Sequence, residues 1–201
     1  MEELEMPYKL EYVRGDLGAS MAKVRALGHE MPQVPTVTLG DEILVESGAI
    51  IETIINRYAP GELTPDIASP DYAKHLMWLH YAEGSLAARL FSDYRAWRTN
   101  PPEARSRMVD SEAVVQYSEN YLKDHDYFGA DFSSADIMMW FPLNVATKLN
   151  LVDEAKFPKI AEWKTRVEAR PAYQRMLAAA RPDGIPGNLP PVKVRPPSAR
   201  G

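Results

Sequence analysis

Apolar and polar residues follow one another in short runs over residues 36–46, a pattern typical of β-strands. The runs "TVTL" and "EILVE" are rich in β-branched and apolar residues. Gly40 and Asp41 separate them, and such a pair strongly favours the tight turn of a β-hairpin. The pattern therefore predicts two short antiparallel strands.

The segments around this hairpin have mixed character. "YKLEYV", residues 8–13, alternates like a strand, whereas residues 18–27 and 48–58 have helical patterns. "MEEL", residues 1–4, is typical of the last turn of a helix. The first part of the chain is therefore expected to combine strands and helices.

The pattern changes after a segment rich in Pro, Gly, Ser and Thr, and from there apolar residues recur at helical spacing. Helices are expected within residues 71–98, 103–125, 128–149 and 157–180, the last with a break before Pro171. We expect four parts: a small α/β domain at 1–59, a linker at 60–70, an all-helical domain at 71–181 and a Pro-rich tail at 182–201.

Composition narrows the function classes. The chain has 201 residues, a net charge of −5 and no cysteine. The negative charge argues against nucleic acid or an anionic membrane as the main partner. Without cysteine there is no thiolate nucleophile, disulfide or Cys-based metal site in the chain.

Targeting and metal signals are also weak. No apolar run approaches the roughly 20 residues of a membrane span, and the acidic N-terminus lacks the apolar region of a signal peptide. We therefore expect a cytoplasmic protein. His75 and His80 lack the i, i+4 spacing of a helical metal pair, so no metal is expected.

Pro35 stands inside the apolar run that leads into the first strand of the hairpin. Proline cannot donate to a sheet ladder, and it is normally confined to edge strands. Pro35 is therefore an edge-strand proline without function, or it follows a cis bond that turns the backbone of Val34 toward an extended peptide ligand.

The stretch "VESGAI" places Glu46 and Ser47 where a strand runs into a helix. Free N–H groups and the helix dipole attract carboxylates to such an N-terminus, and a serine hydroxyl can donate to the same anion. Glu46 can accept from an ammonium group. The pair suits the amino-acid end of a ligand. The alternative is that Ser47 is only the N-cap of the helix and Glu46 a charge of its first turn.

A third motif, "FSSADI", precedes a strongly apolar helix. Ser133 and Asp136 have the spacing of a capping box, and Phe132 can serve as its hydrophobic staple. We assign this motif to folding of the helical domain.

These motifs, with the linker between the second and the third, resemble in order and spacing those of the glutathione transferase superfamily, particularly its fungal members, some of which act in secondary metabolism. The helix that holds "LHYAEGSL", residues 79–86, is similar to the first long helix of those members. The resemblance covers roughly residues 1–180. It implies the glutathione transferase fold, with an N-terminal α/β domain that is thioredoxin-like and an all-α C-terminal domain.

The same resemblance implies a glutathione site. Pro35 would follow a cis bond, and the backbone of Val34 would pair with the cysteinyl part of glutathione. Gln33 would contact the glycine end, while Glu46 and Ser47 would hold the ammonium and carboxylate of the γ-glutamyl end. Glutathione is the expected co-substrate.

One part of the family pattern has no counterpart. The segment "MEELEMPYKL" resembles the end of the family's first helix, so its first strand and most of its first helix are absent. That region usually carries the Tyr, Ser or Cys that stabilises the glutathione thiolate, which leaves the catalytic residue unknown. The chain is a shortened version of a longer protein, or another segment, such as residues 191–194 or a partner chain, fills the gap.

The resemblance implies two chemistries and one competing function. An apolar electrophile would lie between the domains, with Tyr81, Ser85 and Arg89 on one candidate face of the helix. Arg89 or Arg95 could lower the thiol pKa, and the alternative is that both arginines belong to a solvated helix face. The reaction would be conjugation, or reversible thiol addition that isomerises a cis–trans double bond. The alternative is a non-catalytic, glutathione transferase-like module for regulation or protein interaction. A homodimer is expected in either case.

Overall fold

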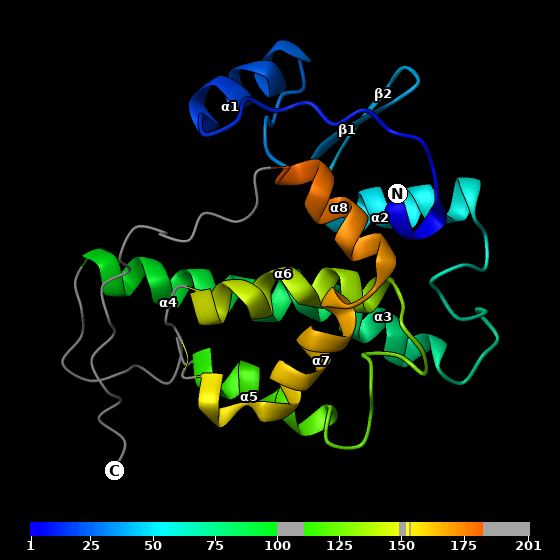
Figure 1. Cartoon of the computed structure of the whole chain (residues 1–201), viewed down its shortest axis with the longest axis vertical. Coiled ribbons are helices and arrows are strands. Elements are labelled where there is room, and N and C mark those ends of the chain that lie inside the picture. The colour runs from blue at the N-terminus through cyan, green and yellow to red at the C-terminus, as the bar shows by residue number, and fades with distance from the viewer. Residues whose placement is uncertain (100–110, 149–151, 153, 183–201) are drawn as a thin grey trace. The chain divides into compact units, whose positions relative to one another are not determined.

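The computed structural model describes residues 1–99, 111–148, 152 and 154–182, and the described chain forms two compact units (Figure 1). The N-terminal unit comprises residues 1–62 together with residues 171–182. The helical unit comprises the described residues of 63–170. The expected tail lies outside the described residues, apart from residue 182.

The hairpin of the N-terminal unit is formed by β1, Thr36–Leu39, and β2, Glu42–Val45. The strands are antiparallel, and their register pairs Thr36 with Val45. Gly40 has a φ of 61°, which glycine adopts without the steric cost of a Cβ. The predicted hairpin is confirmed.

The helices of the N-terminal unit are η1 (Glu2–Leu4), α1 (Leu17–Ala26), α2 (Ser47–Tyr58) and α8 (Pro171–Ala180). Asp16 caps α1, because its side chain accepts a hydrogen bond of 2.8 Å from the N–H of Ala19. In α2 the residue at the N-cap position is Glu46, and Ser47 is the first helical residue. The reading of Ser47 as an N-cap was therefore wrong.

Residues 8–13 do not form the predicted strand. Lys9 and Glu11, two residues apart, make an ion pair of 2.5 Å, which fits an extended backbone. Every second residue of this segment is apolar, and these side chains are 38–49% exposed: Tyr8, Leu10 and Tyr12. A strand needs a neighbouring ladder, and the only sheet of the described residues is the β1–β2 pair.

Helix α8 packs with the N-terminal unit, although we expected residues 71–181 to form the helical domain. Arg175 donates from Nε to the Glu2 carboxylate at 2.9 Å and from Nη2 to the Glu2 carbonyl at 2.8 Å. The hydroxyl of Tyr12 donates to the carbonyl of Ala180 at 3.2 Å. These contacts join segments almost at opposite ends of the chain, which local patterns do not reveal.

The helical unit begins with a helix that changes its winding. Segment η2, Ala82–Ala87, is a π-helix between α3, Tyr72–Tyr81, and α4, Ala88–Thr99. The expected helix at 71–98 is thus present, but its register shifts in the middle, because a π turn holds more residues than an α turn. Helix α6, Ser134–Lys148, packs along α3 and η2 (Figure 1).

The other elements that the structure describes in the helical unit are α5 (Ser111–Tyr121), η4 (Glu154–Lys156) and α7 (Pro158–Glu168). Three aromatic side chains lie in its core, among aliphatic ones. Trp78, Phe128 and Trp163 are each 0% exposed, and Phe128 lies 4.8 Å from the Trp78 ring and 5.0 Å from the Trp163 ring, centroid to centroid. Such ring contacts add to the free energy gained from apolar burial.

The predicted capping box at the start of α6 is confirmed. The Asp136 carboxylate accepts from the N–H of Ser133 at 3.0 Å, and the Ser133 hydroxyl accepts from the N–H of Ala135 at 3.3 Å. Asp136 also accepts from the N–H of Phe128 at 2.9 Å and from Nε1 of Trp163 at 2.8 Å. Burial raises the pKa of Asp136 to about 6, although these donors pull it down.

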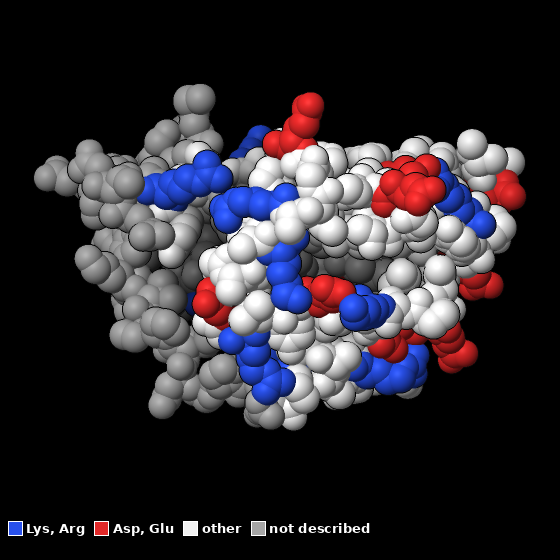
Figure 2. All heavy atoms as spheres, turned by 90° about the horizontal axis from the view of Figure 1, so that it is seen from above, with Lys and Arg blue, Asp and Glu red and all other residues white. Residues whose placement is uncertain are grey.

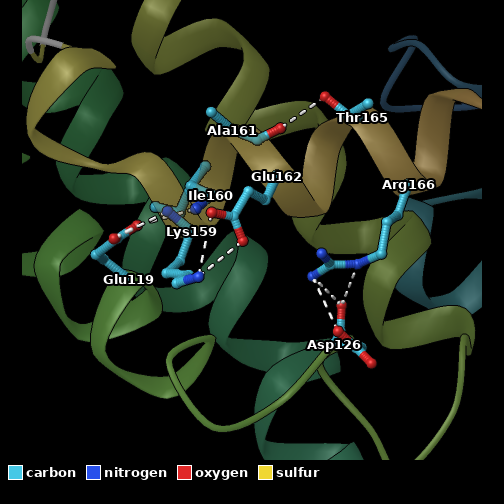
Figure 3. Close-up of polar contacts among 8 residues, drawn as sticks. All are labelled: Glu119, Asp126, Lys159, Ile160, Ala161, Glu162, Thr165 and Arg166. Atoms are coloured by element: carbon cyan, nitrogen blue, oxygen red, sulfur yellow. Dashed lines mark hydrogen bonds and ion pairs between the residues drawn. The ribbon is translucent and has the colours of Figure 1, made fainter.

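A second buried carboxylate caps α7 from another helix (Figure 3). Glu119, 3% exposed on α5, accepts from the backbone N–H groups of Lys159 at 3.0 Å and Ile160 at 2.9 Å. The residue at the N-cap position of α7, Phe157, has no side-chain cap bond. Farther along the helix, Arg166 donates from Nη2 to the carbonyl of Asp126 at 2.8 Å (Figure 3).

The described residues were compared with the requirements of a metal site and of a membrane-spanning helix. No cluster of His, Asp and Glu there could hold a metal ion, and His75 is a core residue that is 2% exposed. No helix in the described part is long and apolar enough to cross a membrane. Figure 2 shows cationic and anionic side chains interspersed over one face, without a large region of one sign.

Candidate functional site

The hairpin brings the two predicted binding segments together. Thr36 pairs with Val45, so the residues before β1 and those after β2 lie at the same end of the hairpin. Nε2 of Gln33 donates a hydrogen bond of 2.8 Å to Oε1 of Glu46, which joins the segments directly. The candidate site is this junction: residues 33–35 and residues 46–47.

The backbone on the β1 side of the junction is open. The Val34–Pro35 peptide bond is cis, as the resemblance implied, and Val34 is 58% exposed. No hydrogen bond within the described residues engages the backbone N–H or C=O of Val34. Both groups can therefore pair with an extended peptide, as an unpaired strand edge does.

The other side of the junction is the start of α2. The first N–H bonded within the helix is that of Ile50, which donates to the Glu46 carbonyl at 2.9 Å. The Glu46 side chain makes no cap bond. The N–H groups of Ser47, Gly48 and Ala49 thus face outward at the positive end of the helix dipole. A Cβ added to Gly48 would meet no atom within 4 Å, so the space there is open.

Glu46 has an unusual backbone conformation. Its φ is 71°, which L-residues rarely adopt, and its side chain is exposed. Backbone strain of this kind costs roughly 1–3 kcal/mol and is concentrated at functional sites. The turn between β2 and α2 therefore fixes Glu46 at a free-energy cost.

Together these groups match a short peptide with one amino-acid end. The Val34 backbone offers one donor and one acceptor to a peptide main chain. The amides at the start of α2 and the Ser47 hydroxyl offer donors to a carboxylate, and Glu46 offers an acceptor to an ammonium group.

The residues predicted to hold an electrophile lie in the helical unit, on three different elements. Tyr81 ends α3, and its hydroxyl donates to the Val114 carbonyl at 3.1 Å. Burial raises the pKa of Tyr81 to about 12. Ser85 is half-buried on η2, and Arg89 is exposed on α4.

Tyr81, Ser85 and Arg89 follow one another at intervals of four residues along one helical segment, which is π-helical over Ala82–Ala87. Their role in binding an electrophile stays a prediction.

Sequence reasoning missed the link between Gln33 and Glu46. The two residues are thirteen positions apart. The only signal was the hairpin, because counting outward from Gly40-Asp41 brings both residues to the same end. No residue pattern in the sequence predicted the positive φ of Glu46.

Comparison with known proteins places this geometry in a family context. Residues 87–171 match the family described as "Glutathione S-transferase, C-terminal domain". The chain is 24% identical over 192 residues to Glutathione S-transferase 3 of Schizosaccharomyces pombe, covering 86% of this chain and 77% of that protein. It is also 24% identical over 202 residues to the Disulfide-bond oxidoreductase YfcG of Escherichia coli, covering 90% of this chain and 88% of that protein.

Solved structures share the fold. A glutathione S-transferase from Actinobacillus pleuropneumoniae matches with a TM-score of 0.78 at 24% identity, covering 91% of this chain and 85% of that one. The matched C-terminal domain, the relatives along most of the chain and the shared fold agree with one another. The chain therefore has the fold of the glutathione S-transferases, and its residues 87–171 match the C-terminal domain of that family.

Proposed function

We propose that this protein is a glutathione-dependent transferase that binds glutathione at the junction of residues 33–35 and 46–47. The observation that carries the proposal is the open Val34 backbone beside the uncapped N-terminus of α2. Glutathione is a short acidic peptide with one amino-acid end, and it has the groups that these two features can bind.

In the proposed complex the Val34 N–H and C=O pair with the cysteinyl part of glutathione. The γ-glutamyl carboxylate accepts from the Ser47 hydroxyl and from the free amides of α2, while its ammonium donates to Glu46. Gln33 lies at the same junction, where the family resemblance assigns it to the glycine end.

The proposed reaction begins with loss of the glutathione thiol proton to solvent, and the positive end of α2 favours the thiolate. In conjugation the sulfur forms a bond to an electrophilic carbon. A halide then leaves, or the neighbouring carbon takes up a proton if the electrophile is an activated olefin. In isomerisation the sulfur adds reversibly, the former double bond rotates, and the thiolate is expelled.

Calorimetric titration with glutathione tests the proposal. Ser47→Ala removes a hydrogen bond to a charged group, worth about 1.5–3 kcal/mol, so we expect affinity to fall roughly 10- to 150-fold. Ser92→Ala, an exposed serine on α4, is the matched control and should leave affinity unchanged. Equal affinity of the Ser47 variant and the wild type would remove Ser47 from the site.

The second experiment measures turnover. A wild-type protein that binds glutathione is offered an activated aryl chloride and a conjugated cis-olefin. Release of chloride supports conjugation, and conversion to the trans-olefin without net consumption of glutathione supports isomerisation. Binding without either product would leave a glutathione-binding protein that is not a transferase for these substrate classes.

A non-catalytic interaction module is the second candidate. Its supporting observation is the exposed apolar face of Tyr8, Leu10 and Tyr12, since exposed apolar side chains in a row favour protein contacts. A folded protein without glutathione affinity would favour this candidate.

We further propose a homodimer for either function. Sedimentation at micromolar concentration measures the mass, and a monomeric value would contradict the proposal.

A further inference from the structure

We propose that Gln33 is a positioning residue, which holds the Glu46 carboxylate in the orientation that receives the ligand's ammonium group. This inference rests on the proposed glutathione site and assigns Gln33 a different role from the glycine-end contact that the family resemblance implies. Its basis is the hydrogen bond of 2.8 Å from Nε2 of Gln33 to Oε1 of Glu46.

Both ends of this hydrogen bond are anchored. The backbone carbonyl of Gln33 accepts from the Thr36 hydroxyl, which ties Gln33 to the first residue of β1. Glu46 lies between β2 and α2, with its carbonyl bonded to the N–H of Ile50 at 2.9 Å. The hydrogen bond between the side chains therefore spans two fixed points of the hairpin.

The bond changes what Glu46 can offer. A free glutamate side chain loses conformational entropy when a ligand orders it, and this loss opposes binding. Gln33 engages Oε1, so part of this cost is met before binding, and Oε2 is left to accept from an ammonium group. Pre-organisation of this kind raises affinity without a new contact to the ligand.

The two roles of Gln33 predict different dependence on the ligand. A glycine-end contact needs the glycine of glutathione, whereas a positioning role needs only the γ-glutamyl end. γ-Glutamylcysteine, which lacks the glycine, therefore separates the two roles. Glu46→Gln separates them independently, because it removes the charge that Gln33 would position.

The experiment measures the affinity of four proteins for glutathione and for γ-glutamylcysteine: wild type, Gln33→Met, Glu46→Gln and the double variant. Methionine matches glutamine in length but donates no hydrogen bond. We expect Gln33→Met to weaken both ligands by about the same factor, roughly 3- to 10-fold. In the Glu46→Gln background the same change should have little further effect.

Each other outcome is decisive. If Gln33→Met weakens glutathione but leaves γ-glutamylcysteine unchanged, Gln33 contacts the glycine end and the inference is overturned. Additive losses in the double variant overturn it as well. If the wild type binds neither ligand, the proposed function itself fails.

Folding is checked by thermal unfolding of each variant. Should Gln33→Met lower the melting temperature, Gln33→Asn replaces it, because asparagine keeps the amide but is one methylene too short to hold the same bond. The expected pattern across the two ligands is the same for this variant.

Discussion

The two units differ in how completely they bury their side chains. In the helical unit Trp78, Phe128 and Trp163 are each 0% exposed, and buried carboxylates are hydrogen-bonded. Within residues 1–62, all of which are described, the buried apolar residues are only Ile50, Ile54 and Ile55 of α2. Stability is therefore concentrated in the helical unit, while the proposed glutathione site lies in the more open unit, where backbone groups stay available to a ligand.

The largest expected effect comes from Trp163→Ala. The change opens a cavity beside Phe128 and removes a donor to Asp136, so the free energy of unfolding should fall by about 3–5 kcal/mol. Leu10→Ala, at a side chain 49% exposed, should cost less than about 1 kcal/mol. Urea unfolding measures both, and similar losses would show that the two units are equally well packed in solution.

Glu119→Ala should rank second. It leaves the N–H groups of Lys159 and Ile160 without their acceptor in a buried place, which costs about 2–4 kcal/mol. Glu119→Gln keeps one carbonyl oxygen as an acceptor and should cost clearly less. Urea unfolding and helicity by circular dichroism are the measurements. Equal losses for the two variants would argue against capping as the cause.

Asp136 gives the helical unit a pH-dependent stability of its own. Its pKa is raised to about 6 in the folded state from 3.8, so the folded protein binds more protons between these values. The contribution of Asp136 to stability is therefore greatest at low pH and is lost as pH rises toward 6, by about 2 kcal/mol between pH 4 and pH 6.

The measured quantity is the difference between wild type and Asp136→Asn at each pH, which cancels the titration of other groups. His75 acts in the opposite direction, because burial lowers its pKa and stability falls as acid protonates the unfolded chain. A difference that does not change with pH would show that Asp136 titrates as it does in the unfolded chain.

The smallest effect concerns the strained junction in the open unit. Glycine has no Cβ to oppose the φ of 71° at Glu46, so Glu46→Gly should be more stable than Glu46→Ala by about 1 kcal/mol. Both variants should bind glutathione more weakly, because both lose the acceptor for its ammonium. Greater stability of the alanine variant would mean that this backbone conformation is relaxed in solution.

Local signals in the sequence predicted the local structure well. Gly40 and Asp41 predicted the hairpin correctly, because the residue types that favour a tight turn are those of the turn itself. Ser133 and Asp136 form the predicted capping box, three residues apart. The hairpin also carried the candidate site, since it brings the segments around Pro35 and Glu46 together.

Features that depend on distant partners could not be predicted. Residues 8–13 have a strand pattern, but a strand requires a ladder that the pattern cannot supply. Helix α8 packs with the N-terminal unit through Arg175 and Glu2, which lie 173 positions apart. The π segment depends on packing rather than on a single residue signal, so the sequence pattern predicted a regular helix over residues 71–98.

The cap on α7 has a consequence for the order of folding. Glu119 lies forty residues before Lys159, so the first amides of α7 gain their acceptor only after α5 and α7 have met. A helix whose start depends on a distant carboxylate nucleates poorly on its own, because its first turn already costs conformational entropy. We therefore expect formation of α7 to be coupled to its packing against α5.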